Sequence, residues 1–423
     1  MDQQAPNMTK TKAQILRELF DAAVESALPE NCMDRYLPQP PKGRTIVVGG
    51  GKAAAAMARA LEAHYTGALE GAVVTRYGYK RRTEHIEVLE AAHPLPDKAG
   101  VVAAETMLEL ARDAGPDDLV ICLMSGGGSA LLSYPAKGIS LEDAQNVTTE
   151  LMRSGATIQD LNTIRKHFSQ VKAGRLAVAA APARLVTLAI SDVAGDDPTV
   201  IASGPTVADP TSMSDVRHII SRFNISLPER MQILLDSDAC ETPKPGDPVF
   251  DNTEYRIIAR PAACLSAAAE IAEQAGYQVE ILSDMVVGEA RTVGALHAAR
   301  AIEAANTGAK LCILSGGEVT VTLTGNGHGG PNREYALALA MGLQGDPRIY
   351  ALAADTDGVD GIGAVAGALI EPDTLKKASE AGIEAADYLE RNDSGPFFHR
   401  IRAEVVTGPT YTNVNDFRAL LIN

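Results

Sequence analysis

Apolar residues recur with two different periods along the chain, and the alternation between these periods predicts the fold class. Residues 12–28 carry apolar positions at helical spacing, which predicts an opening amphipathic helix. Short runs rich in β-branched residues follow, with helical patterns between them. This alternation is typical of a mainly parallel sheet with helices on both faces. We therefore expect an α/β protein.

The same pattern gives residue ranges for the individual elements. In the first half, the predicted strands are residues 44–48, 71–75, 85–89, 118–124 and 184–190, and the predicted helices are residues 52–64, 97–114, 141–154 and 160–180. Further along, strands are expected at 254–259, 277–282, 310–315, 319–324 and 348–354, and helices at 261–275, 288–306 and 332–342. The strand at 319–324 is expected to form a hairpin-like addition to the strand before it.

A break in the pattern divides the chain. A length of 423 residues is too great for one ordinary core. Residues 236–252 accumulate Pro, Asp and Gly while apolar residues become sparse, which indicates a boundary. We predict a Rossmann-like domain with a mainly parallel sheet at 1–240. A second, smaller α/β domain is predicted at 250–423, with a last helix able to pack back on the first domain.

Composition narrows the class of protein further. The formal charge of −16 and the lack of a long Lys/Arg cluster argue against nucleic acid as a partner. The five cysteines are scattered, and Cys122 and Cys312 lie in apolar runs as small buried residues do. This usage is typical of a reducing compartment. With no signal-peptide pattern and no long apolar run, we expect a cytoplasmic protein without a membrane partner.

Two glycine-rich loops follow predicted strands, where ligands of open parallel sheets bind. The first is Gly49, Gly50 and Gly51 followed by Lys52, and the second is Ser125, Gly126, Gly127, Gly128 and Ser129. Glycines let backbone N–H groups approach a ligand closely, and a lysine at the start of a helix favours a bound anion. Both loops therefore predict phosphate or carboxylate binding.

The first loop also permits other interpretations. Gly49 to Ala54 fits the dinucleotide pattern GxGxxA, and Arg76 at the end of the next strand would suit a 2′-phosphate. The spacing does not fit a Walker phosphate loop. A tight strand-to-helix connection with a solvated lysine is the simplest alternative.

Charged residues gather in a few other places. The segment 162–175 holds Arg165, Lys166, His167, Lys172 and Arg175, and as one helix it would place Arg165 and Lys172 on the same face. Carboxylates follow later strands at Asp192, Asp196, Asp357 and Asp360, where they could hold a metal, accept a proton or simply cap turns. The last group comprises Glu318, after the 310–315 strand, and Asn332 and Arg333, at the end of a glycine-rich loop. These clusters together suggest one cleft built by both domains.

Several long motifs resemble one family. They are VVGGGKAAAAMARALE, HPLPD, LMSGGGSALL, NTIRKHFSQVKAGRLA, SDVAGDDPTVIASGPT, LSGGEVTVTLTGNGHGGPNREYALALA, ADTDGVDG, NDSGPFF and TGPTYTNVNDFRALL. The chain resembles the glycerate 2-kinases of the MOFRL type, which have also been named hydroxypyruvate reductases of tartrate utilisation. The resemblance covers nearly the whole chain.

The resemblance implies ATP-dependent phosphorylation of D-glycerate at its 2-hydroxyl, with Mg²⁺, in a cleft between two α/β domains. It implies that Lys52 is the family's essential lysine. The family's second essential cation, the arginine of a GGRNQE motif, falls on Pro331 here, and Arg333 stands two places later. In the ending TGPTGTNVND, the family's glycine is Tyr411.

These observations give a hypothesis for the site. Lys52 would stabilise the transferring phosphoryl group, Asp192 would assist removal of the hydroxyl proton, and Arg333 would act as a second clamp. The two glycine loops, Arg165, Glu318 and Asn332 would bind substrate or phosphate, and one or more of Asp196, Asp357 and Asp360 would hold Mg²⁺.

Two other functions stay open from the sequence. One is an NAD(P)H-dependent hydroxypyruvate reductase, and the other is a nucleotide- or anion-binding protein without turnover. The oligomeric state is not given by the sequence, and a homodimer is one candidate.

Overall fold

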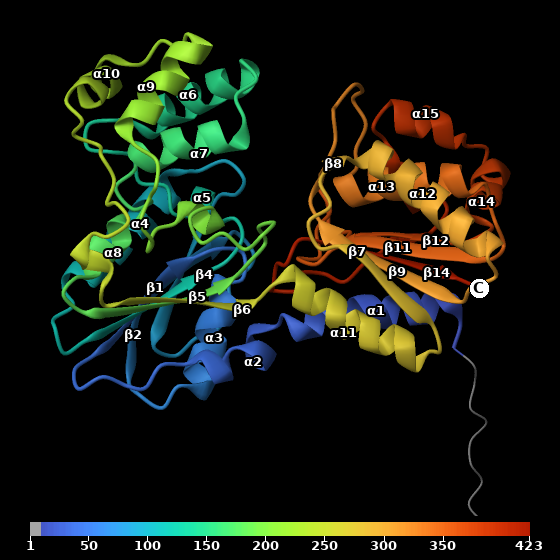
Figure 1. Cartoon of the computed structure of the whole chain (residues 1–423), viewed down its shortest axis with the longest axis horizontal. Helices are drawn as coiled ribbons and strands as arrows, with labels where there is room; N and C mark the ends of the chain where they lie inside the picture. Colours follow the sequence, from blue (N-terminus) through green and yellow to red (C-terminus); the bar gives the residue numbers. More distant parts are fainter. Residues whose placement is uncertain (1–9) are drawn as a thin grey trace, which may run out of the picture. The chain divides into compact units, whose positions relative to one another are not determined.

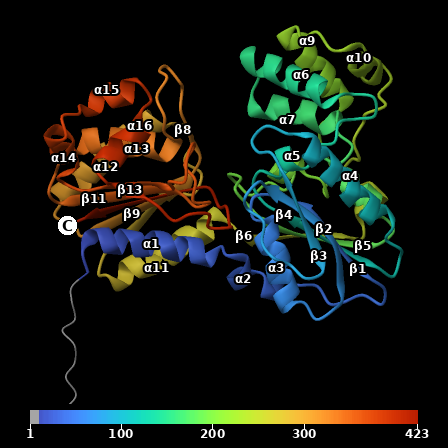
Figure 2. The same ribbon diagram turned by 180° about the vertical axis from the view of Figure 1, so that it is seen from behind.

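The computed structural model describes residues 10–423, which divide into two compact units (Figures 1 and 2). The unit that we call the sheet-and-cap unit comprises Pro29–Ala259 and Tyr411–Asn413. The second unit comprises the chain through Leu28, Arg260–Thr410 and Val414–Asn423. Each unit is described by itself below.

The sheet-and-cap unit contains a six-stranded, all-parallel sheet in the order β3-β2-β1-β4-β5-β6. The strands are β1 (Thr45–Gly50), β2 (Leu69–Arg76), β3 (Ile86–Ala91), β4 (Leu119–Met124), β5 (Arg184–Ile190) and β6 (Thr253–Ala259). This is the strand order of doubly wound dinucleotide-binding folds. Central strands β1 and β4 are buried along their whole length, as their continuous apolar runs predict.

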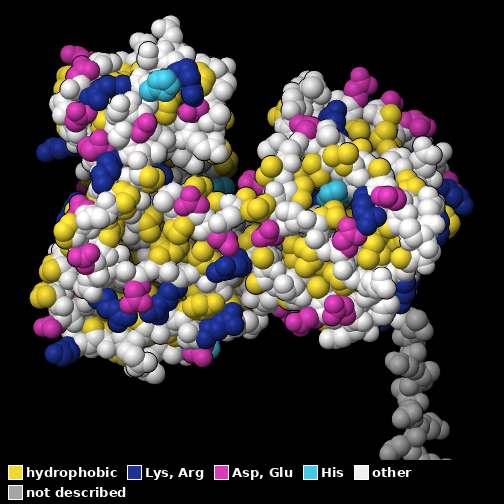
Figure 3. Space-filling model, viewed as in Figure 1, with side chains coloured by type: hydrophobic (Ala, Val, Ile, Leu, Met, Phe, Trp, Pro, Cys, Tyr) yellow, Lys and Arg dark blue, Asp and Glu magenta, His cyan; other side chains and the backbone are white. Residues whose placement is uncertain are grey.

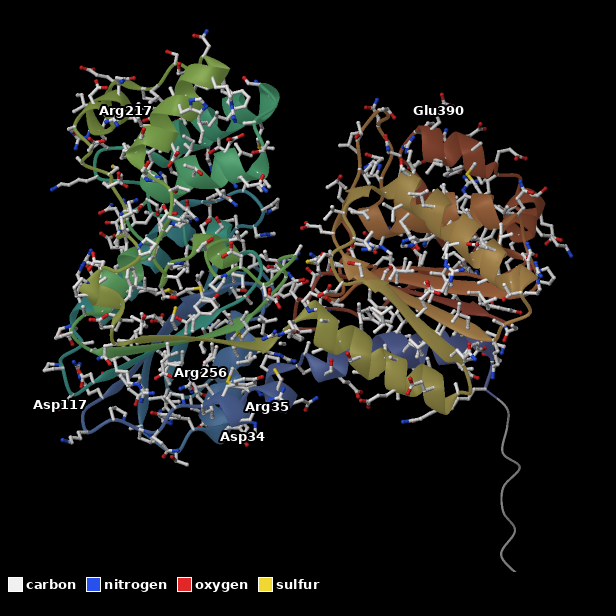
Figure 4. All side chains as sticks on the ribbon, in the orientation of Figure 1. Asp34, Arg35, Asp117, Arg217, Arg256 and Glu390 are labelled. Atoms are coloured by element: carbon white, nitrogen blue, oxygen red, sulfur yellow. The ribbon has the colours of Figure 1, made fainter. Side chains whose placement is uncertain are left out.

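Helices cover both faces of this sheet (Figures 1 and 2). One face is covered by α4 (Lys98–Arg112) and α8 (Arg175–Ala180), whose apolar residues share a core with β1, β4 and β5. The other face is covered by α3 (Ala54–His64), and the short α2 (Pro29–Cys32) packs against α3. Arg256 of β6 donates to the carbonyl of Tyr36, near Asp34 and Arg35 (Figure 4).

A group of helices, which we call the cap, adds a second core to this unit. It consists of α6 (Leu141–Arg153), α7 (Ile158–His167), α9 (Met213–Phe223) and α10 (Glu229–Asp236), at the top in Figure 1. Val147, Ile164, Val216 and Leu234 are among its buried residues. Arg217 of α9, labelled in Figure 4, donates to the carbonyl of Leu235 and fastens α9 to α10. The sequence pattern did not predict α9 and α10.

The second unit is built on a mixed sheet in the order β13-β12-β11-β14-β9-β7. Its strands are β7 (Gln278–Ser283), β9 (Leu311–Gly317), β11 (Ile349–Asp355), β12 (Gly367–Ile370), β13 (Glu404–Val405) and β14 (Asp416–Ile422). Only β7 and β9 pair in parallel, and the other pairs are antiparallel.

Helices of the second unit also lie on both faces of its sheet (Figure 1). On one side, α1 (Lys12–Ser26) packs against α11 (Pro261–Gln274) and β14. On the other side are α12 (Ala290–Asn306) and α13 (Pro331–Leu343). The remaining helices are α5 (Gly128–Leu131), in the sheet-and-cap unit, and α14 (Thr374–Glu380), α15 (Ala385–Glu390) and α16 (Ser394–Arg400), in the second unit.

The predicted elements are mostly present, and two of them differ from expectation. Predicted helix 160–180 is divided into α7 and α8, because Gly174 takes a left-handed φ of 77° and starts α8 afresh. Predicted strand 319–324 is only β10 (Val319–Thr320), which pairs in parallel with β8 (Gly288–Glu289) and forms no hairpin.

The division of the chain also differs from the predicted domains at 1–240 and 250–423. Strand 253–259 completes the first sheet as β6, so the change of unit falls at Ala259 and not in the 236–252 segment. The opening helix belongs to the second unit, because its apolar face packs on α11 and β14. The chain ends in a buried strand, β14, where a last helix was expected.

Several surface and core features complete the description. Among residues 10–423, no helix has both the length and the apolar character needed to cross a membrane. All five cysteines are buried, as Cys122 and Cys312 were expected to be. Figure 3 shows acidic, basic and apolar side chains interspersed over the visible faces of the units.

Because α1 belongs to the core of the second unit, its apolar face should matter for stability. Phe20 is 1% exposed and packs edge-on against Phe417, with ring centroids 5.8 Å apart. Phe20→Ala should lower the free energy of unfolding by about 3–5 kcal/mol, measured by urea denaturation. Glu25→Ala, on the exposed face of the same helix, should change it by less than about 0.5 kcal/mol. Equal effects of the two substitutions would contradict this packing.

Candidate active site

The two glycine-rich loops lie side by side at the carboxyl edge of the parallel sheet. Strands β1 and β4 are neighbours, and the crossovers that follow them run in opposite directions in the strand order. Such a switch point is where ligands bind in open α/β sheets. The N–H of Lys52 donates to the carbonyl of Gly126 over 2.8 Å, and the N–H of Ala53 donates to Ser125 Oγ over 3.0 Å. The loops are therefore joined directly.

Two glycines make this close approach possible. At Gly51, with a φ of +147°, a Cβ atom would lie 2.1 Å from Ser125 Oγ. At Gly126, a Cβ atom would lie 2.0 Å from Asp192 Oδ2 and 2.2 Å from Asn413 Nδ2. Real Cβ atoms do not approach other atoms so closely, so both positions require glycine.

Asp192 and Asn413 form a pair against the second glycine loop. Asn413 Nδ2 donates to Asp192 Oδ2 over 3.0 Å. Asp192 follows β5, whereas Asn413 comes from the far end of the chain and nevertheless belongs to the same unit. Asn413 is only 3% exposed, so the carboxylate meets a buried donor. Asp192 is thereby held beside the loop.

Lys52 lies next to the same loop. A Cβ atom at Gly127 would lie 3.3 Å from Lys52 Cγ and 2.9 Å from His93 Cδ2. Within the described residues, no hydrogen bond uses the N–H of Gly126 or Gly127. The structure therefore brings a lysine, two available N–H donors and Asp192 to one edge of the sheet.

The basic segment 162–175 separates into two groups with different surroundings. Lys166 forms a buried ion pair with Asp209, with the Nζ and Oδ1 atoms 3.3 Å apart. Arg175 donates to backbone carbonyls, among them those of Lys166 and Cys240. These residues hold the cap together. Arg165 and Lys172 instead line a pocket.

This pocket, of about 320 Å³, lies within the sheet-and-cap unit between the cap and the glycine loop. Its floor includes Gly127 and Ser129 of the loop and His93. Its walls are mainly apolar and come from α6, α7 and the 133–135 segment. Among the described residues that line it, Arg165 and Lys172 are cationic and none is acidic. The lining therefore favours an anionic ligand.

Lys172 is almost fully buried, and its charge is only partly compensated. Its Nζ donates to the carbonyls of Ser129 and Leu132 over 2.7 and 2.8 Å. Burial, with a smaller effect of the nearby Arg165 charge, lowers the pKa of Lys172 to about 7. Burial also lowers the pKa of Arg165. A bound anion would favour the charged form of both side chains.

Most of the remaining predicted site residues lie in the second unit, where several are paired. Arg333 Nε donates to Asp360 Oδ2 over 2.9 Å, and both side chains are buried. Arg333 also donates to the carbonyls of Asp360 and Ile362. Asn332 Nδ2 donates to Asp416 Oδ1 over 2.6 Å. This pairing fastens the start of α13 to the loop after β11 and to the start of β14.

The other three predicted residues are placed as follows. Asp357 lies in the loop after β11, where its carboxylate accepts the N–H of Val359 over 2.7 Å. Glu318 lies directly after β9 and is exposed. Asp196 belongs to the other unit, in the turn after β5, with a left-handed φ of 55°.

The described residues contain no group of three or more His, Cys, Asp or Glu side chains close enough to hold a metal ion. Asp196 and the pair Asp357 and Asp360 belong to different units. Mg²⁺ in phosphoryl-transfer sites commonly uses one or two carboxylates together with substrate phosphates. The carboxylates after β5 have the chemistry for that mode, and the magnesium site remains a prediction.

Comparisons with known proteins decide the family. Residues 15–236 match a family described as a domain of unknown function, DUF4147, and residues 311–416 match the MOFRL family. The D-glycerate 2-kinase of Thermotoga maritima is 36% identical over 405 residues, covering 94% of this chain and 95% of that protein. The chain belongs to the DUF4147/MOFRL glycerate kinase family. The predicted family and fold class are thus confirmed.

A solved structure and one further relative are also similar to this chain. A crystal structure of the Thermotoga maritima glycerate kinase superposes with a TM-score of 0.86 at 34% identity, covering 97% of this chain and 99% of that one. A protein of Agrobacterium vitis is 49% identical over 416 residues, covering 97% of this chain and 94% of its own length. Its name is "Putative hydroxypyruvate reductase".

The sequence had not assigned three residues that the structure places at this candidate site. Lys172 was seen only as part of a basic segment, because its burial depends on the division of the predicted helix. Asn413 was contained in the ending TNVND, whose contact with Asp192 spans 221 positions. Ser203 shares a hydrogen bond of 2.9 Å with Ser129, and its motif, VIASGPT, was the only available signal.

The lowered pKa of Lys172 gives a testable pH dependence. An anion in the pocket favours protonated Lys172, so affinity should fall as pH rises above about 7. Calorimetry with sulfate, which does not titrate in this range, should show up to about tenfold weaker binding per pH unit above that value. Lys172→Met should bind sulfate weakly and without this dependence. Lys137→Met, at an exposed position outside the lining, should behave as the unaltered protein, and an equal pH response in both variants would contradict the assignment.

Proposed function

We propose that this protein phosphorylates D-glycerate at its 2-hydroxyl with ATP, giving 2-phosphoglycerate. The observation that carries the proposal is the joined pair of glycine loops, with Lys52 and Asp192 beside a cationic pocket. Phosphoryl transfer depends mainly on positioning and on stabilising negative charge, and these groups supply both. The Thermotoga maritima relative named D-glycerate 2-kinase supports the same substrate and position.

Each group has a proposed part in the reaction. Lys52 stabilises negative charge on the transferring phosphoryl group, and the N–H groups of Gly126 and Gly127 bind its oxygens. Arg165, with Lys172 behind it, binds the carboxylate of glycerate. Asp192, fixed by the Asn413 amide, assists removal of the proton from the 2-hydroxyl. The surrounding glycines and the hydroxyls of Ser125 and Ser129 shape the loops.

Mg²⁺ is proposed as the metal that accompanies ATP. When bound, it would neutralise charge on the phosphate oxygens. Asp196, in the sheet-and-cap unit, is its proposed ligand, and Asp357 stays a prediction from the sequence. Asp360 was predicted with them, and its pairing with Arg333 favours a structural role for both residues. Glu318 and Asn332 remain proposed contacts of substrate or phosphate.

A second candidate is an NAD(P)H-dependent hydroxypyruvate reductase. The strand order, the GxGxxA pattern after β1 and the Agrobacterium vitis relative favour it. Arg76 ends β2, where a 2′-phosphate would bind, and its guanidinium lies 4.3 Å from the ring centroid of Tyr79. A nucleotide- or anion-binding protein without turnover is the third candidate.

A paired assay on the purified protein separates the three candidates. One reaction contains D-glycerate, ATP and Mg²⁺, and the product is identified as 2- or 3-phosphoglycerate. The other contains hydroxypyruvate with NADPH or NADH and is followed by absorbance. Formation of 2-phosphoglycerate without loss of reduced cofactor is the expected result. Cofactor oxidation alone would establish the reductase, and binding of ATP or glycerate without either reaction would support the third candidate.

Removal of the Lys52 ammonium should strongly reduce turnover. Lys52→Ala is expected to lower kcat for D-glycerate phosphorylation by about a hundredfold or more, because a charge stabiliser of the transition state is lost. The matched control is Lys98→Ala, which removes an exposed lysine from the start of another helix, α4. Near-normal turnover of Lys52→Ala would exclude Lys52 from this role.

A further inference from the structure

Tyr411 has a backbone conformation that glycine adopts more easily. Its φ is 63°, in the left-handed region, where a residue with a bulky side chain is strained. This is the position at which the resemblance noted above has glycine. We therefore expect contacts around the Tyr411 ring that offset this backbone strain.

The ring of Tyr411 lies in a ladder in which two neighbouring aromatic rings are flanked by two guanidinium groups. The Arg81 guanidinium lies 3.6 Å from the centroid of the Tyr411 ring. The ring of Tyr79 meets it edge-on, with centroids 5.9 Å apart, and Arg76 lies over the Tyr79 ring. Within the described residues, Arg81 makes no ion pair, so the aromatic face is its main electrostatic partner.

The loop that carries Tyr79 and Arg81 is itself fixed to the sheet. Tyr79 is 5% exposed, and its N–H donates to the carbonyl of Arg76 at the end of β2. The N–H of Gly78 donates to Glu90 Oε1 over 2.7 Å. A few residues later, the Glu62 carboxylate of α3 accepts three consecutive N–H groups, at residues 84–86. The ladder is thus attached to β2, β3 and α3.

The segment that Tyr411 anchors leads directly to the candidate active site. Thr412 and Asn413 follow it and are 1% and 3% exposed. Asn413 donates to Asp192, whose carboxylate lies against Gly126. A displacement at Tyr411 would reach the Asp192 carboxylate through two intervening peptide units. The ladder and the donor to Asp192 are therefore one continuous structure within the sheet-and-cap unit.

We propose that Tyr411 is a positioning residue, whose ring, held by Arg81 and Tyr79, fixes Asn413 on the Asp192 carboxylate. The kinetic part of this inference rests on the proposed function. Tyr411→Gly relieves backbone strain and removes the anchor, so the two effects on stability oppose one another. The effect on positioning has one direction only, because the segment loses the ring contacts that hold it at Tyr411. We therefore expect kcat to fall clearly while the thermal midpoint changes little.

The test compares Tyr411→Gly with Tyr411→Phe, which keeps the ring, and with Arg81→Met, which removes the cation. Tyr411→Gly should lower kcat for D-glycerate phosphorylation by about ten- to a hundredfold, with KM for ATP little changed and the thermal midpoint near that of the unaltered protein. Tyr411→Phe should restore normal kcat. Arg81→Met should also lower kcat. This variant tests the proposal if Tyr411→Gly does not fold.

Gln344→Gly provides a matched control for the backbone effect. Gln344 also has a left-handed φ, of 51°, but it caps α13 in the second unit and is exposed. This substitution should leave kcat unchanged. If Tyr411→Gly keeps normal kcat, or if Tyr411→Phe loses as much as Tyr411→Gly, the positioning role is excluded.

A second measurement separates this inference from the proposed function. Hydrogen–deuterium exchange of the unligated protein should be faster at residues 411–413 in Tyr411→Gly and unchanged there in Tyr411→Phe and Gln344→Gly. An unaltered protein that does not phosphorylate D-glycerate would overturn the proposed function. In that case the exchange result alone decides whether Tyr411 anchors the segment, and unchanged exchange in Tyr411→Gly would exclude it.

Discussion

The close backbone approach between the loops after β1 and β4 is the constraint on which the candidate site depends. At Gly51 and Gly126 there is no space for a Cβ atom, because Ser125, Asp192 and Asn413 occupy it. A side chain at either position would force apart loops that now share hydrogen bonds. The separation would displace Lys52 relative to the N–H groups of Gly126 and Gly127. The chemistry of the site thus depends first on the absence of side chains at Gly51 and Gly126.

The cap explains how an acidic protein can offer an anion site. The chain has a formal charge of −16, yet the lining of the pocket beneath the cap holds Arg165 and Lys172 and, among the described residues, no carboxylate. Carboxylates of this region pair with other side chains. Asp209, for example, forms an ion pair with Lys166. Burial makes the charged forms of Arg165 and Lys172 unfavourable until an anion binds in the pocket. Local arrangement, and not net charge, sets the ligand preference.

The strands and most helices could be predicted from the sequence because hydrophobic periodicity is a local property. The loops after β1 and β4 could also be placed, since the carboxyl ends of parallel strands share one edge. Three features could not be predicted, because each depends on contacts between distant residues. They are the assignment of α1 to the second unit, the joining of β6 to the first sheet, and the Asn413–Asp192 pair.

The basic segment 162–175, which contains Arg165, Lys166 and Lys172, shows the same limit of prediction from sequence. Their grouping was visible in the sequence, and one helix was expected to carry them. Gly174 permits a new helix start after a turn, so that Lys172 faces the glycine loop while Lys166 joins the cap. Spacing alone therefore identified a basic cluster, and tertiary structure decided which of its members can meet a ligand.

The path of the chain has a consequence for its synthesis. The opening helix, α1, packs on α11, which begins at Pro261, and on β14, which ends at Ile422. On a ribosome, α1 emerges before residues 29–259 of the sheet-and-cap unit, which are made before its own partners α11 and β14. At about 5–20 residues per second, that interval is on the order of ten seconds or more, during which the apolar face of α1 has no native partner. Asn413 likewise reaches the sheet-and-cap unit only after residues 29–259 of that unit have been made.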